Sequence, residues 1–213
     1  LFATVLLVSN VASTKLVVLG PFTFDGGTLL FPLAYIFGDV LTEVYGYRKS
    51  RRVIWIGFFA LLLATLTFQA VAHLPAPPDA ESQRFGEAFG LLLGLTPRIV
   101  LGSLLAYFLG EFANAYVLAK LKVRTEGRFF WLRALASTLV GQGLDTGVFL
   151  LVAFYGVFPK EVLLAVFLSN YAFKLGVEAL MLPFTYAVVG FLKRAEGMDA
   201  YDRDTDFNPF RLT

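Results

Sequence analysis

The sequence contains no cysteine and only one histidine, His73. Without cysteine the chain can form neither a disulfide nor a thiolate metal site, and a single histidine excludes sites built on a histidine pair. The HExxH and GxSxG motifs of hydrolases are absent as well. We therefore expect neither an enzyme nor a bound cofactor or metal.

Charge is also scarce. Charged residues make up 16% of the chain and hydrophobic residues 57%, whereas about 25% charged residues is usual in a soluble domain. So few charges cannot cover the surface of a water-soluble protein of 213 residues. A large soluble core is the alternative, but soluble elements rarely keep about 18 apolar residues in succession. The composition therefore predicts an all-α integral membrane protein.

Six apolar segments of membrane-spanning length follow one another along the chain, separated by glycine, proline and charged residues. The first lacks the charged leader and small-residue cleavage site of a signal peptide, so we expect a mature helix there. Pro183 should kink the last. The segments predict a six-helix transmembrane domain over residues 1–194. Its spans are expected at about 1–19, 28–45, 53–74, 97–121, 129–155 and 160–192.

Two segments fall outside these spans. Residues 81–93 repeat Phe85, Phe89 and Leu92 at helical spacing, which predicts a short helix lying on the outer membrane surface. We favour a connector over a lid above an outer entrance as its role. Residues 195–213 are polar and acidic, and they are expected to form a solvated cytoplasmic tail.

Lysine and arginine are concentrated in alternate loops. Short loops rich in these residues stay in the cytoplasm, so both termini are predicted to be cytoplasmic. The basic residues near the predicted cytoplasmic helix ends are Arg48, Lys49, Arg51, Arg52, Lys120, Lys122, Arg124, Arg128, Lys193 and Arg194.

Polar and ionisable side chains interrupt five of the six spans. Each ionised group at mid-bilayer costs roughly 2.5–3.5 kcal/mol, so these side chains should face the interior of the bundle. Asn170, Lys174 and Glu178 are spaced as a stripe on one helix face, and they either contact a substrate or include an internal Lys174–Glu178 ion pair. The predicted substrate-binding residues are Asn10, Glu111, Asn114, Gln142, Asp145, Asn170, Lys174 and Glu178.

Asp39 and Glu43 lie four residues apart and share a face of the second span, near its predicted cytoplasmic end. We expect them to form gating or structural ion pairs, with Arg133 or with the basic residues 48 and 52 as partners.

Aromatic residues accompany the polar ones, among them Tyr107, Phe149 and Tyr171. Stacking combined with hydrogen bonds along one edge suits a flat heterocycle. A carboxylate can accept two N–H groups from a guanine-like edge, and glutamine or asparagine can bind the adjacent carbonyl. The alternative, that these rings only pack or contact lipid, stays open at this point.

Four strings carry a family resemblance. The most specific is Gly-Asp-Val-Leu-Thr-Glu-Val-Tyr-Gly at 38–46, which is followed by a basic run. The others are Ser-Asn-Val-Ala-Ser-Thr-Lys at 9–15, Gly-Glu-Phe-Ala-Asn at 110–114 and Gly-Gln-Gly-Leu-Asp-Thr at 141–146. Together they resemble the queuosine precursor transporter family, also called the vitamin uptake transporter family, from the first span to the sixth.

The resemblance implies a six-helix protein of the bacterial inner membrane, similar in fold to the substrate-binding components of energy-coupling-factor transporters. It implies import of 7-deazaguanine precursors of queuosine, in cyano or aminomethyl form, without an ATPase module. On this hypothesis Asp145 or Glu111 binds the amino-pyrimidine edge, while Gln142 and Asn170 bind the carbonyl and ring nitrogens.

The expected partners are the small 7-deazapurine substrate and the lipid bilayer, with no nucleic acid. A homodimer is left open by small residues such as Gly102 and Ala106. The alternative function is a vitamin-binding subunit of an ATP-driven importer of the energy-coupling-factor type. The energy source is also open, since a carboxylate such as Glu178 could carry a proton or transport could be facilitated diffusion.

Overall fold

The structure is a computed structural model, and it describes residues 1–19, 22–94 and 97–211. Within these ranges the chain forms helices almost throughout, with one antiparallel hairpin and one 3-10 turn, η1 (Gly26–Leu29). In the hairpin β1 (Leu16–Leu19) pairs with β2 (Phe22–Asp25). The helices are α1 (Phe2–Ala12), α2 (Phe31–Tyr45), α3 (Tyr47–Ala72), α4 (Ala80–Leu93), α5 (Pro97–Arg124), α6 (Phe130–Phe154) and α7 (Lys160–Glu196).

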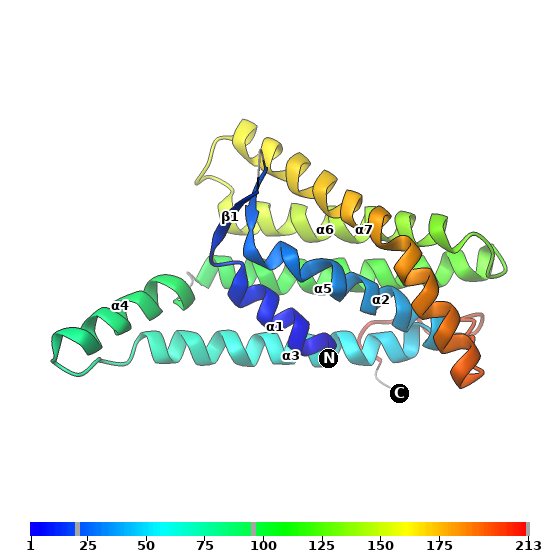
Figure 1. The fold of residues 1–213 in the computed structure, drawn as a ribbon, viewed down its shortest axis with the longest axis horizontal. Helices are drawn as coiled ribbons and strands as arrows, with labels where there is room; N and C mark the ends of the chain where they lie inside the picture. The colour runs from blue at the N-terminus through cyan, green and yellow to red at the C-terminus, as the bar shows by residue number, and fades with distance from the viewer. Residues whose placement is uncertain (20–21, 95–96, 212–213) are drawn as a thin grey trace.

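The long helices form an elongated bundle. In Figure 1, α3, α5 and α6 run nearly parallel to its long axis, α7 crosses obliquely, and α4 projects at one end. Among the described residues, α3, α5, α6 and α7 are long and apolar enough to cross a membrane. The chain is therefore an all-α membrane protein, apart from the short hairpin.

The expected first span is wrong in its second half. Helix α1 has 11 residues and ends at Ala12, and residues 16–19 form β1 instead of more helix. The hydroxyl groups of Ser13 and Thr14 donate to the carbonyls of Ser9 and Val11, an alternative to continued helix at the end of α1. The run Leu-Val-Val-Leu that follows is rich in β-branched residues, which favours a strand.

The other helices lie close to the expected ranges. Helix α3 begins at Tyr47, earlier than the predicted residue 53, and α7 continues through Pro183 to Glu196. The short helix α4 begins after Asp79, whose carboxylate caps it by accepting from the backbone N–H of Ser82 at 2.8 Å. No residue of α4 is buried, as a helix lying on a surface requires.

Helices α5 and α6 cross at two glycines that face each other. A Cβ atom added at Gly110 would lie 2.8 Å from Cβ of Asp145 and 3.0 Å from the carbonyl oxygen of Gly141. A Cβ atom at Gly141 would lie 2.8 Å from Cβ of Asn114. The missing side chains thus let the two backbones approach closely. This crossing brings the polar residues of both helices into one layer.

The C-terminal residues pack against the bundle, although most of residues 197–211 are exposed to solvent as expected. Residues 197–211, which we call the C-terminal strap, fold back along the N-terminal half of α3. The carboxylate of Asp202 is buried and accepts from the backbone N–H of Tyr47 at 2.9 Å. The Arg51 guanidinium donates to two strap carbonyls, at 2.9 and 2.6 Å, and Trp55 donates to a third at 2.8 Å. The acidic composition of this segment did not indicate the packing, because the strap contacts the bundle mainly through backbone carbonyls and every second side chain.

The strap lies at the end of the bundle where the α2–α3 turn, the α5–α6 turn and the end of α7 meet (Figure 1). We call this the basic end. Its lysine and arginine residues are Arg48, Lys49, Arg51, Arg52, Lys120, Lys122, Arg124, Arg128, Arg133, Lys193, Arg194, Arg203 and Arg211.

Candidate substrate-binding site

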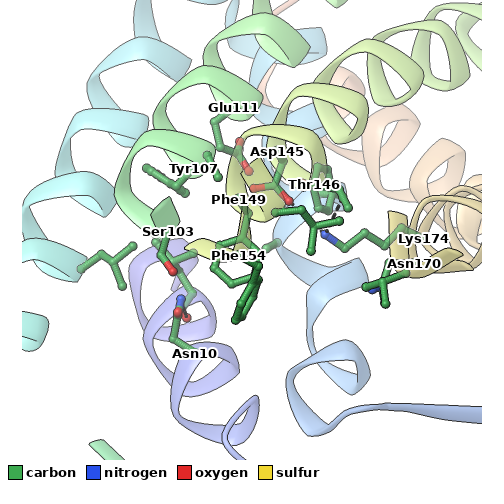
Figure 2. A pocket seen from close by; sticks show the side chains of 17 residues that line it. Asn10, Ser103, Tyr107, Glu111, Asp145, Thr146, Phe149, Phe154, Asn170 and Lys174 are labelled. Atoms are coloured by element: carbon green, nitrogen blue, oxygen red, sulfur yellow. Dashed lines mark hydrogen bonds and ion pairs between the residues drawn. The ribbon is translucent and has the colours of Figure 1, made fainter. Parts of the chain in front are cut away.

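A cavity of about 270 Å³ lies among α1, α2, α3, α5, α6 and α7. Its lining combines carboxyl, amide, hydroxyl and ammonium groups with aromatic rings. Figure 2 shows Glu111 of α5 and Asp145 of α6 next to each other on one side, and Asn10 and Ser103 on another. The aromatic side chains that line it are Tyr35, Tyr107, Phe149 and Phe154. A flat polar solute would find both stacking surfaces and hydrogen-bonding groups here.

The cavity collects most of the substrate-binding residues predicted from the sequence. They come from α1, α5, α6 and α7, four helices that are separated along the chain, so the long-range packing of the bundle assembles them. These residues are Asn10, Glu111, Asp145, Asn170 and Lys174.

Lys174 pairs across the helices instead of along its own helix. Its ammonium group lies 2.9 Å from Oδ2 of Asp145 on α6 and 3.5 Å from the Thr146 hydroxyl. The expected Lys174–Glu178 ion pair is not among the contacts of the described residues, because Glu178 faces α2. Both members of the observed pair are partly exposed, at 19% of each side chain, so they remain accessible from the cavity.

Glu111 forms the boundary between two spaces. Its side chain lines the cavity, and it also lines a much smaller space of about 10 Å³ together with Thr42, Ser50 and Asn114. The residue is only 7% exposed, and among the described residues no lysine or arginine forms an ion pair with it. Glu111 can therefore accept hydrogen bonds from a solute in the cavity without first giving up an ion pair.

The other predicted substrate-binding residues lie behind the cavity wall. Asn114 donates from Nδ2 to Oδ1 of Asp39 at 2.9 Å, and Gln142 hydrogen-bonds Tyr35, which does line the cavity. Glu178 is 2% exposed and lies against Asp39. In this structure these residues support the cavity and do not line it.

Of the three residues expected to form gating or structural ion pairs, Glu43 and Arg133 bind each other, and Asp39 does not pair with either. Arg133 binds Glu43 with both terminal nitrogens, at 2.5 and 3.1 Å, and each side chain is 1% exposed. Asp39 forms no ion pair with any described residue, because it lies one helical turn deeper than Glu43 and meets Asn114 and Glu178 instead.

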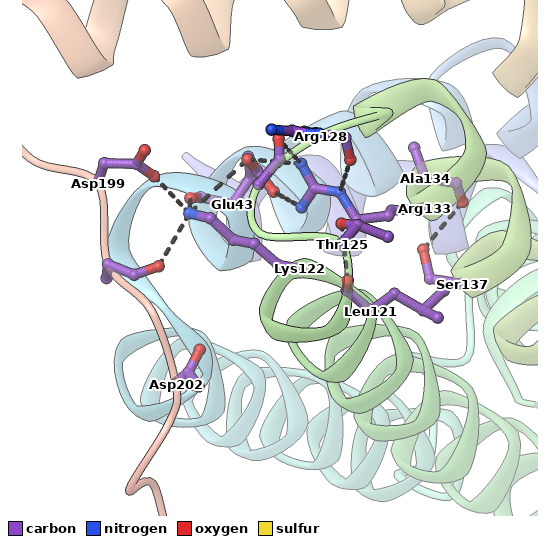
Figure 3. Close-up of polar contacts among 12 residues, drawn as sticks. Glu43, Leu121, Lys122, Thr125, Arg128, Arg133, Ala134, Ser137, Asp199 and Asp202 are labelled. Carbon is purple, nitrogen blue, oxygen red and sulfur yellow. Dashed lines mark hydrogen bonds and ion pairs between the residues drawn. The ribbon is translucent and has the colours of Figure 1, made fainter.

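Glu43 is the centre of a larger ionic cluster at the basic end. Lys193 lies 2.8 Å and Lys122 3.7 Å from its carboxylate, and both lysines also bind Asp199 of the strap. Figure 3 shows Lys122 between Glu43 and Asp199. Burial by itself would raise the pKa of Asp199, but hydrogen bonds from Lys122 and Lys193 hold that pKa below its usual value. The cluster thus joins α2, α5, α6, α7 and the strap.

Sequence reasoning missed Tyr35 in the cavity and Lys122 in the ionic cluster. Tyr35 precedes Asp39 by one helical turn, so its spacing already placed it on the polar face of α2. Lys122 follows Asn114 by eight residues, which places it near the same face of α5, and it was assigned only to a loop. In both cases helical spacing was the available signal.

Comparisons with known proteins agree with this picture. A family model described as "Putative vitamin uptake transporter" matches residues 25–188. A relative from Bacillus subtilis, named "Probable queuosine precursor transporter", is 36% identical over 188 residues, which cover 87% of this chain and 80% of the relative. The "Queuosine precursor transporter" of Escherichia coli is 27% identical over 168 residues, covering 76% and 71% of the two chains.

A third relative, from Haemophilus influenzae, is also named "Probable queuosine precursor transporter". It is 26% identical over 166 residues, covering 76% of this chain and 67% of the relative. No solved structure matches the chain. The family match runs from α2 through most of α7 and so includes the helices that build the cavity except α1. The chain therefore belongs to the vitamin uptake transporter family, a family of membrane transporters and not of enzymes.

Proposed function

We propose that the protein imports queuosine precursors, as 7-deazaguanine bases in cyano or aminomethyl form, across the bacterial inner membrane. The names of the three relatives support the substrate, and the cavity supports a transport site for it. Its volume of about 270 Å³ is close to the lower end of the ~300–1,000 Å³ usual for small-molecule sites, as suits a bicyclic base.

One observation carries the proposal most directly. Two carboxyl groups, on Glu111 and Asp145, lie side by side in a cavity that also has aromatic walls (Figure 2). Asp145 binds Lys174 through Oδ2, which leaves its other oxygen for a donor on the substrate. A guanine-like edge presents adjacent N–H donors, and such an edge matches acceptors in this arrangement. Asn170 and Asn10 supply amides for the carbonyl and ring nitrogens.

We further propose six membrane crossings with both termini in the cytoplasm, in a fold similar to the substrate-binding components of energy-coupling-factor transporters. Helices α1 and α2 have 11 and 15 residues, about 17 and 23 Å of helix, so their crossings would need the adjoining hairpin and turn. The concentration of lysine and arginine at the basic end supports a cytoplasmic location for that end.

The transporter would act as a facilitator or a secondary transporter, as a monomer or homodimer, without an ATPase module. A vitamin-binding subunit of an ATP-driven importer is the alternative. Direct binding to the purified protein distinguishes the two, with both precursors as ligands and guanine and biotin as comparison ligands. Binding of biotin but of neither precursor would exclude the proposed substrate.

Uptake in cells that cannot make the precursors tests the site. We expect Glu111→Ala and Asp145→Ala each to lower precursor uptake about tenfold or more, because a lost hydrogen bond to a charged acceptor costs about 1.5–3 kcal/mol. Glu87→Ala, which changes an exposed carboxylate on α4, is the matched control and should transport normally. Normal uptake by both cavity variants would show that the substrate binds elsewhere.

A further inference from the structure

Two acidic side chains meet inside the bundle, and no lysine or arginine in the described part of the chain forms an ion pair with either of them. Asp39 of α2 is 0% exposed and Glu178 of α7 is 2% exposed, and Glu178 lies within hydrogen-bonding range of Asp39. Asn114 satisfies one oxygen of Asp39. Oδ2 of Asp39 and Oε1 of Glu178 are buried and have no hydrogen-bond partner among the described residues. We call these two residues the carboxyl pair.

The cations nearest in the bundle are engaged elsewhere. Arg133, Lys122 and Lys193 bind Glu43, and Lys174 binds Asp145. Helix α1 has no ionisable side chain, and Arg51 of α3 binds the strap. The titratable and charged side chains that the helices around the pair bury or partly bury inside the bundle include Tyr35 and Glu43 on α2, Tyr107, Glu111 and Lys122 on α5, Arg133 and Asp145 on α6, and Lys174 and Lys193 on α7.

Two ionised carboxylates in this position would be unfavourable for two reasons. Each would lose its hydration without gaining a cation, and the two charges would repel each other at close range. One bound proton removes both costs, because the protonated carboxyl group then donates a hydrogen bond to its neighbour. Each of the two residues has one buried oxygen atom without a partner among the described residues, and a bound proton would satisfy such an atom.

The carboxyl pair is also close to the cavity. A Cβ atom at Gly38, the residue before Asp39, would lie 3.4 Å from Oε2 of Glu111, which lines the cavity. Glu178 shares α7 with Lys174 and Asn170, which line the cavity one and two turns earlier. A movement of α7 that follows substrate binding would therefore also move Glu178 relative to Asp39.

We propose that the carboxyl pair binds a proton, and that the protein imports its substrate together with that proton. This inference rests on the proposed function. The proton enters from outside with the substrate and is released inside, so proton movement down its gradient drives substrate uptake in the same cycle. Coupling arises because occupancy of the cavity and separation of Asp39 from Glu178 depend on the same helix, α7.

Purified protein in liposomes tests this directly. Uptake of a radiolabelled 7-deazaguanine base is measured under two conditions: with the liposome interior one pH unit more alkaline than the outside, and with equal pH on both sides. In both, equal potassium concentrations and valinomycin hold the membrane voltage at zero. If one proton enters with each substrate molecule, a gradient of one pH unit can raise the substrate concentration inside the liposomes up to about tenfold above that outside. A pH dye inside the liposomes should report acidification only when substrate is added outside.

Two variants test the assignment. In Asp39→Asn and in Glu178→Gln, the ratio of uptake with the gradient to uptake without it should fall to one. Glu161→Gln makes the same chemical change at an exposed position on α7 and should keep the ratio of the unchanged protein. A ratio that stays high in both pair variants would place the proton elsewhere and overturn the assignment.

The remaining outcomes are distinct. Substrate exchange across the liposome membrane without any response to the gradient would overturn proton coupling and leave the proposed function intact. Absence of both binding and exchange would contradict the proposed function itself. If a pair variant does not assemble, the gradient response and the dye signal of the unchanged protein still decide whether transport is coupled to protons.

Discussion

Glu43 has more ionic partners than any other carboxylate among the described residues. Arg133 contacts both of its oxygens, and Lys193 and Lys122 approach Oε1. The side chains of Glu43, Arg133 and Lys122 are 2% exposed or less, so water cannot replace a lost partner. The residue thus compensates positive charge contributed by three other helices.

Removal of that charge should destabilise the protein strongly. We expect Glu43→Gln to lower the free energy of unfolding by about 3–5 kcal/mol, because Arg133 would remain buried without a counter-charge. Thermal unfolding in detergent measures the effect. Glu126→Gln, at an exposed position in the α5–α6 turn, is the control and should unfold near the original temperature. Equal melting temperatures for the two variants would contradict this role of Glu43.

At the scale of elements, the crossing of α5 and α6 positions the cavity. The facing glycines allow the two helices to approach closely. Each glycine is followed by a polar residue: Glu111, which lines the cavity, and Gln142, which lies behind the cavity wall. Separation of the two helices by the width of a methyl group would move Glu111 away from Asp145. The geometry of the cavity therefore depends on two residues that have no side chain.

A single methyl group at the crossing tests this dependence. We expect Gly110→Ala to reduce precursor binding at least tenfold and to lower stability by about 1–3 kcal/mol, since the new Cβ would lie 2.8 Å from Cβ of Asp145. Gly176→Ala on α7 is the control, because nothing lies within 4 Å of a Cβ atom there. That variant should bind normally and gain stability, as helical alanine replacing glycine usually does. Normal binding by Gly110→Ala would show that the crossing tolerates separation.

At the scale of the whole molecule, ionic and polar contacts are distributed unevenly along the bundle. The basic end holds the Glu43 cluster and the strap, whereas α4 projects near the opposite end (Figure 1). This asymmetry matches the distribution of lysine and arginine that predicts a cytoplasmic basic end.

The absence of cysteine makes the orientation easy to measure. Single cysteines are introduced by Glu87→Cys on α4 and by Arg203→Cys in the strap, both at exposed positions. A membrane-impermeant thiol reagent added to intact cells should label the first variant and leave the second unlabelled until the membrane is opened. Labelling of the strap variant from outside would reverse the proposed orientation.

The sequence by itself determined the helices and the chemistry inside the bundle. Hydropathy and segment length are properties of a local stretch of chain, so α5, α6 and α7 were predicted within a few residues. The cost of burying charge in lipid indicated that Glu111, Asp145 and the other ionisable residues face inward. Even the Glu43–Arg133 pair could be predicted, because both residues stand near the same end of their helices.

Only the tertiary structure decided which side chains meet. Helical periodicity places a residue on a face but does not specify the rotation of that helix against its neighbours, so Lys174 was matched with Glu178 and not with Asp145. Asp39 was assigned an arginine for the same reason, and the structure shows it against Glu178. The strap escaped prediction because mainly backbone carbonyls and alternate side chains hold it to α3, and the partners of backbone groups are set by long-range packing.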